Sequence, residues 1–222
     1  MRWQTWWKPP LRAPRRRCCS RTRTGPPYIA KIRAAKPDIV ITANWGNDMT
    51  LLVKAAGESE LKVSFYTYFG SLFGAASVMG DAAMDRVVGV WRWHPNLPIE
   101  AERLAREEYR RRYDSEYYVT GDRMTIEMLA AAIDRARSTD PLRVAYALEG
   151  MRLQGSMGSV WMRPDDHQLL EPLYVLGLTQ VNGRDVKYGI EGANTGTRTL
   201  LRIEAADTAV PTRCEMRRPP QP

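Results

Sequence analysis

The sequence predicts an α/β protein with a parallel sheet flanked by helices. Three apolar runs of strand length, at residues 38–42, 62–67 and 86–93, support this prediction. A segment with helical periodicity lies between the first two runs, and a turn or break follows each run. Strands and helices at such short intervals are typical of parallel sheets. With 222 residues, the chain is long enough to bury a substantial core.

The net charge of +8 is concentrated at the amino-terminal end of the chain. Residues 1–27 contain eight Lys or Arg and no acidic residue, so the other 25 basic residues balance the 25 acidic ones. This segment is also rich in Trp and Pro and lacks helical or strand periodicity. It is either a basic arm for nucleic acid or anionic lipid, or a disordered tail outside the domain. The abrupt change of composition at Tyr28 favours the tail, and we expect no nucleic-acid partner.

The sequence gives no sign of a membrane span, a signal peptide or a metal site. No apolar run reaches the ~18 residues of a membrane helix, and no apolar core follows the basic segment. The vicinal Cys18 and Cys19 and the distant Cys214 have no metal-ligand spacing. A disulfide from either to Cys214 stays open but unsupported. We expect neither a metal nor a cofactor.

The turn after the first predicted strand contains Asn44, Trp45 and Asp48. Ligands of parallel sheets bind at the carboxyl ends of the strands. There, an indole ring offers flat contact area, and the neighbouring amide and carboxylate can bind polar groups. Alternatively, Trp45 packs in a domain interface, and Asn47 or Asp48 only caps the next helix. The sequence does not decide between these interpretations.

Two longer helices are expected between residues 98 and 136. In the first, residues 98–113, Glu and Arg alternate at i,i+4 spacing with Glu first, which indicates a solvated face. Its pairs are Glu102–Arg106, Glu107–Arg111 and Glu108–Arg112. The second begins at Thr120 or Asp122 and has an apolar stripe that predicts core packing. The stripe consists of Met124, Met128, Leu129, Ala132, Ile133 and Ala136.

The remaining segment favours strands. Residues 159–162 and 172–181 are expected to be strands, and Asn182-Gly183 predicts a hairpin with residues 186–190 as the returning strand. Residues 197–203 form a last strand or a short helix. Asp165 and Asp166 beside His167 are interpreted as a turn, because three consecutive side chains cannot converge on one ion.

The sequence contains no recognised catalytic motif. A dinucleotide-binding glycine loop, a phosphate-binding loop, a zinc-protease motif and a nucleophile elbow are all missing from it. No nucleophile and base stand out as a set, so a hydrolase is disfavoured. We expect a protein that is not an enzyme and has no catalytic residues.

Five stretches in order resemble the later portion of the branched-chain amino-acid, type I periplasmic substrate-binding proteins of ABC uptake systems. They are PYIAKIRAAKPDIVITANWGNDMTLLVKAA, VSFYTYF, VVGVWRWH, GSVWMRPDDHQLLEPLYV and VPTRCEMRRP. The resemblance runs from about Tyr28 to about Pro219. It implies a fold of two α/β lobes joined by three chain crossings, with ligand trapped between the lobes.

Under this resemblance the chain divides into four parts. Residues 1–27 are the basic tail, and residues 28–97 form part of lobe two. Residues 98–180 form the carboxyl-terminal part of lobe one, and residues 181–222 return to lobe two and end in a tail. The chain is then an amino-terminally truncated member with its second lobe incomplete. Part of the site that holds the ligand's carboxylate would be missing, so binding is expected to be impaired.

The implied function is that of the solute-binding component of an ABC uptake system for amino acids or related small molecules. The expected ligand-binding residues are Asn44, Trp45, Asp48, Tyr68, Phe69, Tyr118 and Asp122. Many relatives have a carboxylate for the ligand's ammonium group where this chain has Tyr68-Phe69-Gly70. An aromatic ring cannot replace that ion pair, although it can form a cation–π contact. The ligand class is therefore open beyond branched-chain amino acids.

The resemblance also implies partners and a compartment. The partners are a small-molecule ligand, namely an amino acid or an analogue, and ABC permease subunits in the membrane if the protein is full-length. The family's compartment is the periplasm, whereas this chain, expressed as given without a signal peptide, would be cytoplasmic. The alternative is a ligand-sensing regulatory domain of the same bilobal fold.

Overall fold

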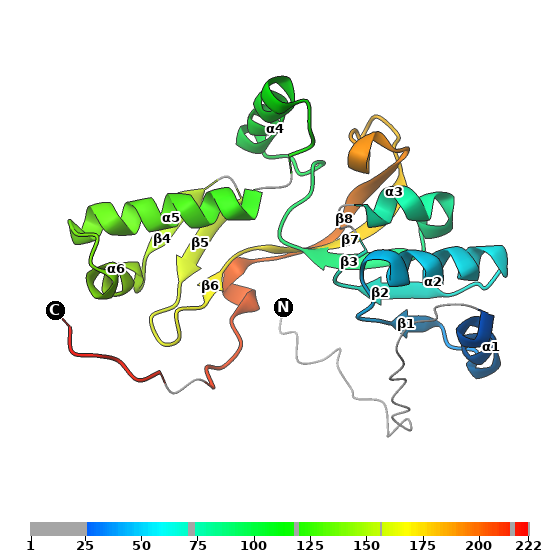
Figure 1. The fold of residues 1–222 in the computed structure, drawn as a ribbon, viewed down its shortest axis with the longest axis horizontal. Helices are drawn as coiled ribbons and strands as arrows, with labels where there is room; N and C mark the ends of the chain where they lie inside the picture. Colours follow the sequence, from blue (N-terminus) through cyan, green and yellow to red (C-terminus); the bar gives the residue numbers. More distant parts are fainter. Residues whose placement is uncertain (1–25, 71–73, 118–119, 156, 214–215, 222) are drawn as a thin grey trace.

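The computed structural model describes residues 26–221 except residues 71–73, 118–119, 156 and 214–215 (Figure 1). Cys18, Cys19 and Cys214 therefore lie outside the described residues. The described chain forms one sheet of five strands and another of three. The two sheets occupy different parts of the molecule, and long strands and crossing segments join them (Figure 1).

The larger sheet is mixed. Its strands, from one edge to the other, are β1 (Ile39–Ile41), β2 (Ser64–Thr67), β3 (Val87–Trp91), β7 (Leu173–Gln180) and β8 (Thr195–Ile203). β1, β2 and β3 run parallel, as the sequence predicts. β7 and β8 extend the sheet antiparallel to their neighbours.

Three helices pack with the parallel strands. They are α1 (Pro26–Ala35), α2 (Gly46–Glu58) and α3 (Ala75–Met79), and a 3₁₀ turn, η2 (Gly80–Ala83), follows α3. α2 and α3 lie in front of the sheet in Figure 1. Fully buried Met49 and Ala56 of α2 share one core with Phe65 of β2 and Val87 of β3.

The start of α2 differs from the prediction. The residue before the helix is Trp45, in an extended conformation, and no side chain caps the first turn. The expectation that Asn47 or Asp48 caps this helix is therefore wrong. Asp48 lies within the first turn instead, where its negative charge is favourable beside the unpaired amides of the helix end.

The second part of the molecule has its own core. It contains α4 (Glu100–Tyr113), α5 (Thr120–Ala136), α6 (Pro141–Leu148), β4 (Arg152–Gly155), β5 (Gly158–Met162) and β6 (Leu169–Leu170). Met124 and Met128 of α5 are buried with Val160 of β5, as the stripe predicts. The prediction is wrong for Leu129 of the same stripe, which is 41% exposed. Asp140 caps α6 by accepting a hydrogen bond from the Arg143 amide at 3.0 Å. β4 and β6 are short strands that the sequence did not indicate.

The hairpin predicted at Asn182-Gly183 is wrong in its returning strand. The strand that pairs with β7 is β8, which begins at Thr195 and not at residue 186. The Asn96 side chain explains the difference, because its carbonyl oxygen accepts hydrogen bonds from the amides of Lys187 and Tyr188, both at 2.8 Å. These amides are therefore not available to a strand ladder. Residues 197–203 are strand, one of the two predicted alternatives.

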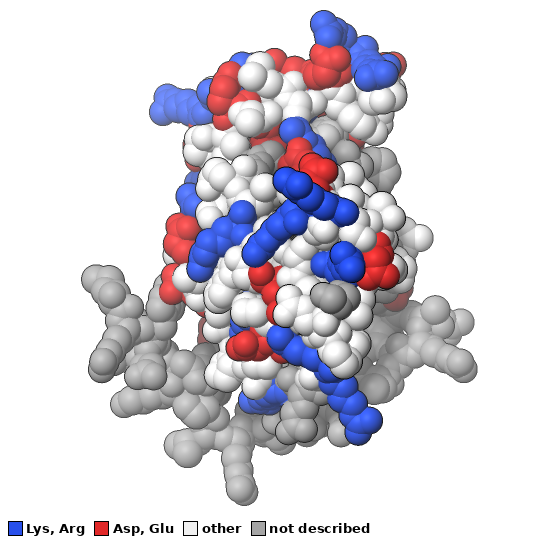
Figure 2. Space-filling model, turned by 90° about the vertical axis from the view of Figure 1, so that its left-hand side faces the viewer, with Lys and Arg blue, Asp and Glu red and all other residues white. Residues whose placement is uncertain are grey.

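The charged side chains are mixed over the end of the molecule that carries α5 and α6. Figure 2 shows Lys and Arg interspersed with Asp and Glu on this face. This distribution agrees with the balanced charge of the sequence after residue 27. Such a mixed surface is unlike the basic stripe of a nucleic-acid interface.

Candidate ligand-binding site

β1 and β2 are each followed by a turn of the same kind. Thr42 follows β1, and its hydroxyl accepts a hydrogen bond from the Asn44 amide at 3.1 Å. Thr67 ends β2, and its hydroxyl accepts one from the Phe69 amide, also at 3.1 Å. A hydroxyl that binds the amide two residues ahead turns the chain out of the sheet. Because the strands are parallel neighbours, both turns lie at the same edge.

Aromatic side chains stand at the carboxyl ends of three adjacent strands. Trp45 after β1 is 70% exposed, Tyr68 after β2 is 64% exposed, and Trp91 at the end of β3 is 36% exposed. Phe69 is half-buried beside Tyr68. We call Trp45, Tyr68 and Trp91 the aromatic row. Trp91 was missed in the sequence because the predicted strand of residues 86–93 continues past it, whereas β3 ends at Trp91.

The other expected site residues are divided between the two parts of the molecule. Asn44 is half-buried in the turn after β1, and Asp48 is exposed in the first turn of α2. Asp122 is exposed in the first turn of α5, which belongs to the part with β4–β6 (Figure 1). Tyr118 lies outside the described residues. The structure therefore gathers five of the seven predicted residues at one sheet edge.

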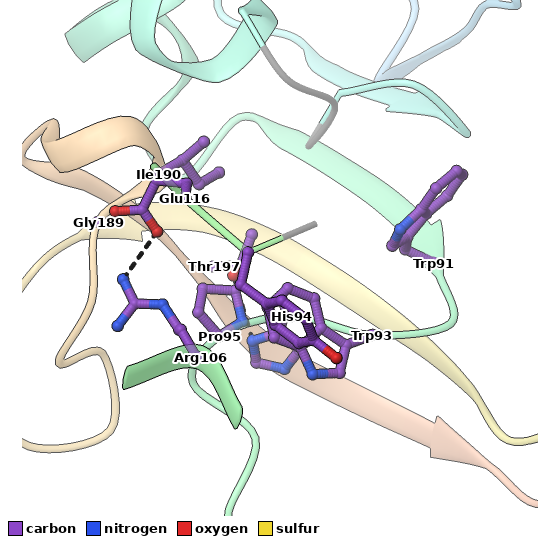
Figure 3. Close-up of a pocket in the computed structure, with 10 residues that line it drawn as sticks. Trp91, Trp93, His94, Pro95, Arg106, Glu116, Gly189, Ile190 and Thr197 are labelled. Carbon is purple, nitrogen blue, oxygen red and sulfur yellow. Dashed lines mark hydrogen bonds and ion pairs between the residues drawn. The ribbon is translucent and has the colours of Figure 1, made fainter. Parts of the chain in front are cut away.

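A pocket lies beyond the end of β3 (Figure 3). It has an empty volume of about 420 Å³, part of which is open to solvent. Its walls come from the crossing between β3 and α4, from α4 and the segment after it, and from residues before and within β8. The lining residues are Trp91, Trp93, His94, Pro95, Arg106, Glu116, Tyr117, Gly189, Ile190 and Thr197.

Arg106 is the buried cation of this pocket. Its side chain is 5% exposed and donates to Glu116 Oε2 at 3.0 Å, the contact drawn in Figure 3. Its guanidinium carbon lies 4.3 Å from the centroid of the Tyr188 ring. The solvated-face interpretation of α4 is therefore wrong for Arg106 and for Glu102, which are both buried. The i,i+4 pattern cannot indicate that the segment containing Tyr188 folds back over this helix.

Three buried polar groups of the pocket have no hydrogen-bond partner among the described residues. They are Nε1 of Trp93, Nε of Arg106 and the hydroxyl of Tyr117, and all three residues are more than nine-tenths buried. A buried polar group without a partner costs free energy, so a water or a ligand oxygen that bonded to one of them would stabilise the pocket. Trp91 links this pocket to the aromatic row, because it belongs to both.

His94 holds the crossing segment against β8. Its Nε2 lies 2.7 Å from Thr199 Oγ1, and its Nδ1 lies 3.1 Å from Thr197 Oγ1. Burial lowers the pKa of His94 to about 4, so the imidazole is neutral at physiological pH. A second link joins Arg92 Nε to Glu171 Oε1 at 3.2 Å. Burial raises the pKa of Glu171, and the charge of Arg92 opposes that rise.

A two-part α/β architecture with exposed aromatic rings at one sheet edge is compatible with binding of small solutes between lobes. The model of the periplasmic binding protein family matches residues 26–184, and the chain belongs to this family. Among its relatives is Leu/Ile/Val-binding protein homolog 4 of Brucella melitensis, 31% identical over 199 residues. That alignment covers 87% of this chain and 47% of the relative. The expectation of a family of binding proteins, and not of enzymes, is confirmed.

Solved structures agree with this assignment. The leucine-, isoleucine-, valine-, threonine- and alanine-binding protein of Brucella ovis, in its closed conformation, matches with a TM-score of 0.77 and 27% identity. The match covers 87% of this chain and 50% of that one. A leucine binding protein of Thermotoga maritima shares the fold at a TM-score of 0.64 and 15% identity. The chain thus spans about half the length of the relatives it matches.

Among the described residues, no helix combines the length and the apolar character needed to cross a membrane. The same residues contain no group of three His, Cys, Asp or Glu arranged around a metal.

Proposed function

We propose that the chain is part of the solute-binding component of an ABC-type uptake system for amino acids or related small molecules. The observation that carries this proposal is the aromatic row, in which three adjacent parallel strands expose a ring at the same edge. The relatives support the ligand class, since the Brucella ovis protein is described as binding five amino acids. By the same resemblance, its compartment is the periplasm and its partner a membrane permease.

The proposed ligand lies against one wall made by Asn44, Trp45, Asp48, Tyr68 and Phe69. Tyr118 and Asp122 would approach it from the opposite lobe. An aromatic wall suits an apolar or aromatic side chain, and its rings can also contact an ammonium group. A distant relative of the same fold, from Rhodopseudomonas palustris, is described in complex with 3,4-dihydroxybenzoic acid. We therefore include aromatic acids with amino acids in the ligand class.

The lobes follow the two sheets in this proposal. We assign β1–β3, β7 and β8 to lobe two, and α5, α6 and β4–β6 to lobe one. Because β7 pairs with β3, the part assigned to lobe one ends before Leu173 rather than at residue 180. The crossings between the lobes then include the segment from Arg92 to α4 and the segment at Glu171, which the ion pair between these residues ties together.

Ligand would close the lobes by a population shift. A molecule that contacts both lobes only when they are close together stabilises the closed state by its extra contacts. The aromatic row supplies the contacts on lobe two. The pocket at Arg106 lies at the crossing, where a change of lobe angle would alter its shape.

Titration of the chain with leucine, phenylalanine and 4-hydroxybenzoate, followed by calorimetry and by tryptophan fluorescence, tests the proposal. We expect Trp45→Ala to weaken binding about tenfold, because the ring supplies stacking area. Trp161→Phe, on β5 in the other part of the molecule, is the matched control and should leave the affinity unchanged. Equal affinities for Trp45→Ala and the unaltered chain would rule out the site. Failure of all three ligands to bind would rule out the function.

A further inference from the structure

A short segment near the carboxyl end lies against the second part of the molecule (Figure 1). It consists of residues 216–221, which belong to no helix or strand, and we call it the tail. Within it, Pro219 and Pro220 follow Arg218. Proline fixes its own φ and disfavours the helical region for the residue before it. The sequence of the tail therefore favours an extended, polyproline-like conformation.

Two elements of the second part present polar groups to the tail. The Tyr146 hydroxyl of α6 donates a hydrogen bond to the Pro219 carbonyl. The Arg218 guanidinium donates to Glu149 Oε2 at the end of α6, at 3.1 Å. It also donates to the carbonyl of Pro164, in the turn between β5 and β6. Three groups from two elements thus converge on two consecutive residues of the tail.

The side chain of Glu149 is oriented for its contact with arginine. It is 17% exposed, and its other oxygen, Oε1, lies 2.9 Å from Nε2 of His167. A carboxylate only accepts hydrogen bonds, so Nε2 of His167 carries the proton of this contact. The φ of His167 is 56°, which is uncommon for residues other than glycine. The turn of residues 163–168 therefore places a donor that leaves one carboxylate oxygen for Arg218.

A second contact holds the chain before the tail against the same turn. Arg163 is buried, and its Nη1 donates to the Val210 carbonyl at 2.6 Å. Its Nε donates to Asp166 Oδ1 at 2.8 Å, so a carboxylate of the turn balances the buried charge. This contact keeps the tether of the tail short. A short tether raises the effective concentration of a segment at its binding site.

The tail itself is held weakly. Met216 is half-buried, the rest of its described residues are exposed, and the side chain of Arg218 is 38% exposed. The contacts are hydrogen bonds and an ion pair near the surface, each of which contributes little to stability. Occupancy of the site therefore depends on the tether, and the tail is able to leave the site.

We propose that Tyr146, Glu149 and Pro164 form a recognition site for an arginine–proline segment, with the tail as its occupant within the chain. Proline-rich segments are bound by aromatic side chains because their conformation is preformed and little entropy is lost. Arginine is required because its guanidinium reaches two acceptors at once, which the ammonium of lysine does not match. A partner segment of the same chemistry would exchange with the tail. The site is separate from the aromatic row and independent of the proposed function.

Limited trypsin cleavage of the full chain, followed by mass spectrometry, measures how often the tail leaves the site. Trypsin cleaves after Arg217 in a released tail, whereas the proline after Arg218 protects the next bond. Cleavage tracks the population of the open form when opening and closing are fast. Tyr146→Phe and Glu149→Gln should each raise the rate of cleavage after Arg217 at least about fivefold, which is the effect of one hydrogen bond.

Two exposed positions of α4 provide matched controls. Tyr113→Phe and Glu108→Gln should leave the rate of cleavage unchanged, because both side chains are more than half exposed and make no printed-sequence contact with the tail. Circular dichroism verifies that all four variants fold, which is expected because each substitution keeps the shape of the side chain. Unchanged cleavage in both Tyr146→Phe and Glu149→Gln, or an equal increase in the controls, overturns the proposed site.

A peptide competes for the site in the same assay. Acetyl-Arg-Pro-Pro-Gln amide, the sequence of residues 218–221, resists trypsin and should speed cleavage of the tail above the effective concentration of the tether, on the order of millimolar. The same peptide with lysine in place of arginine should act at least about fivefold more weakly. Equal effects of the two peptides would refute the recognition of arginine. A tail that is protected only in a dimer, detected by sedimentation velocity, would assign the occupant to a second copy and overturn occupancy within the chain.

Discussion

His94 should make the stability of this protein depend on pH in the mildly acidic range. In the unfolded chain its pKa is the ordinary 6.5, whereas burial lowers it to about 4 in the folded protein. Between these values the unfolded chain binds a proton that the folded chain does not. The stability that the neutral His94 contributes is therefore fully present above the pKa of the unfolded chain, and it is lost as the pH falls toward the pKa of the folded protein.

The magnitude follows from the difference between the two pKa values. At ~1.4 kcal/mol per pKa unit, the full loss is about 3 kcal/mol, and about 2 kcal/mol of it is reached near pH 5. Thr197 and Thr199 do not prevent this loss, because hydroxyl groups only weakly stabilise a buried imidazolium. A loss of this size is a substantial part of the stability of a typical domain.

Urea unfolding at about pH 7.5 and about pH 5, followed by far-ultraviolet circular dichroism, measures the loss. Other groups contribute to the same pH dependence, so the comparison is with His94→Gln, which cannot take up the proton. The variant should lose about 2 kcal/mol less than the unaltered chain between the two pH values. His167→Gln, which retains His94, is the control and should keep the step. Equal pH dependence of His94→Gln and the unaltered chain would refute the reasoning.

Two further predictions concern packing and a buried carboxyl. Met124 is fully buried in the core of the second part, so Met124→Ala should cost about 2–5 kcal/mol in urea unfolding. Ile126→Ala, at a 64% exposed position on the same helix, should change stability by less than about 0.5 kcal/mol; similar losses for both would contradict the assigned core. Burial raises the pKa of Glu171 above its ordinary value, so its proton stabilises the fold and its contribution falls as the pH rises through the folded pKa. Glu171→Gln should flatten this dependence in thermal unfolding between about pH 4 and pH 7, and an unchanged profile would show that Glu171 is not desolvated.

Local patterns predicted the first half of the larger sheet well. β1, β2 and β3 lie within the three predicted apolar runs, and α2 begins at Gly46, a few residues after β1. These elements depend on the composition of short segments, which a sequence displays directly. The period of the stripe likewise indicates the buried side of α5 at Met124 and Met128, although it fails at Leu129 near the border of that side.

Long-range contacts explain the predictions that were wrong. Asn96 binds the amides of Lys187 and Tyr188 from 91 and 92 residues away, so no local pattern near Asn182-Gly183 could indicate the wide loop. Arg106 has the spacing of an exposed helix residue, yet the ring of Tyr188 covers it. Trp91 joins the aromatic row only because β3 lies beside β2, which is a property of the assembled sheet.

The repeated threonine turns separate the architecture of the sheet from its chemistry. Thr42 and Thr67 fix where the chain leaves β1 and β2, whereas Trp45 and Tyr68 are largely exposed and contribute little to the core. Exchange of the exposed rings should therefore alter what the edge recognises while the strands stay in place. If the proposed site is right, such a division lets one or two substitutions change the ligand while the fold is retained.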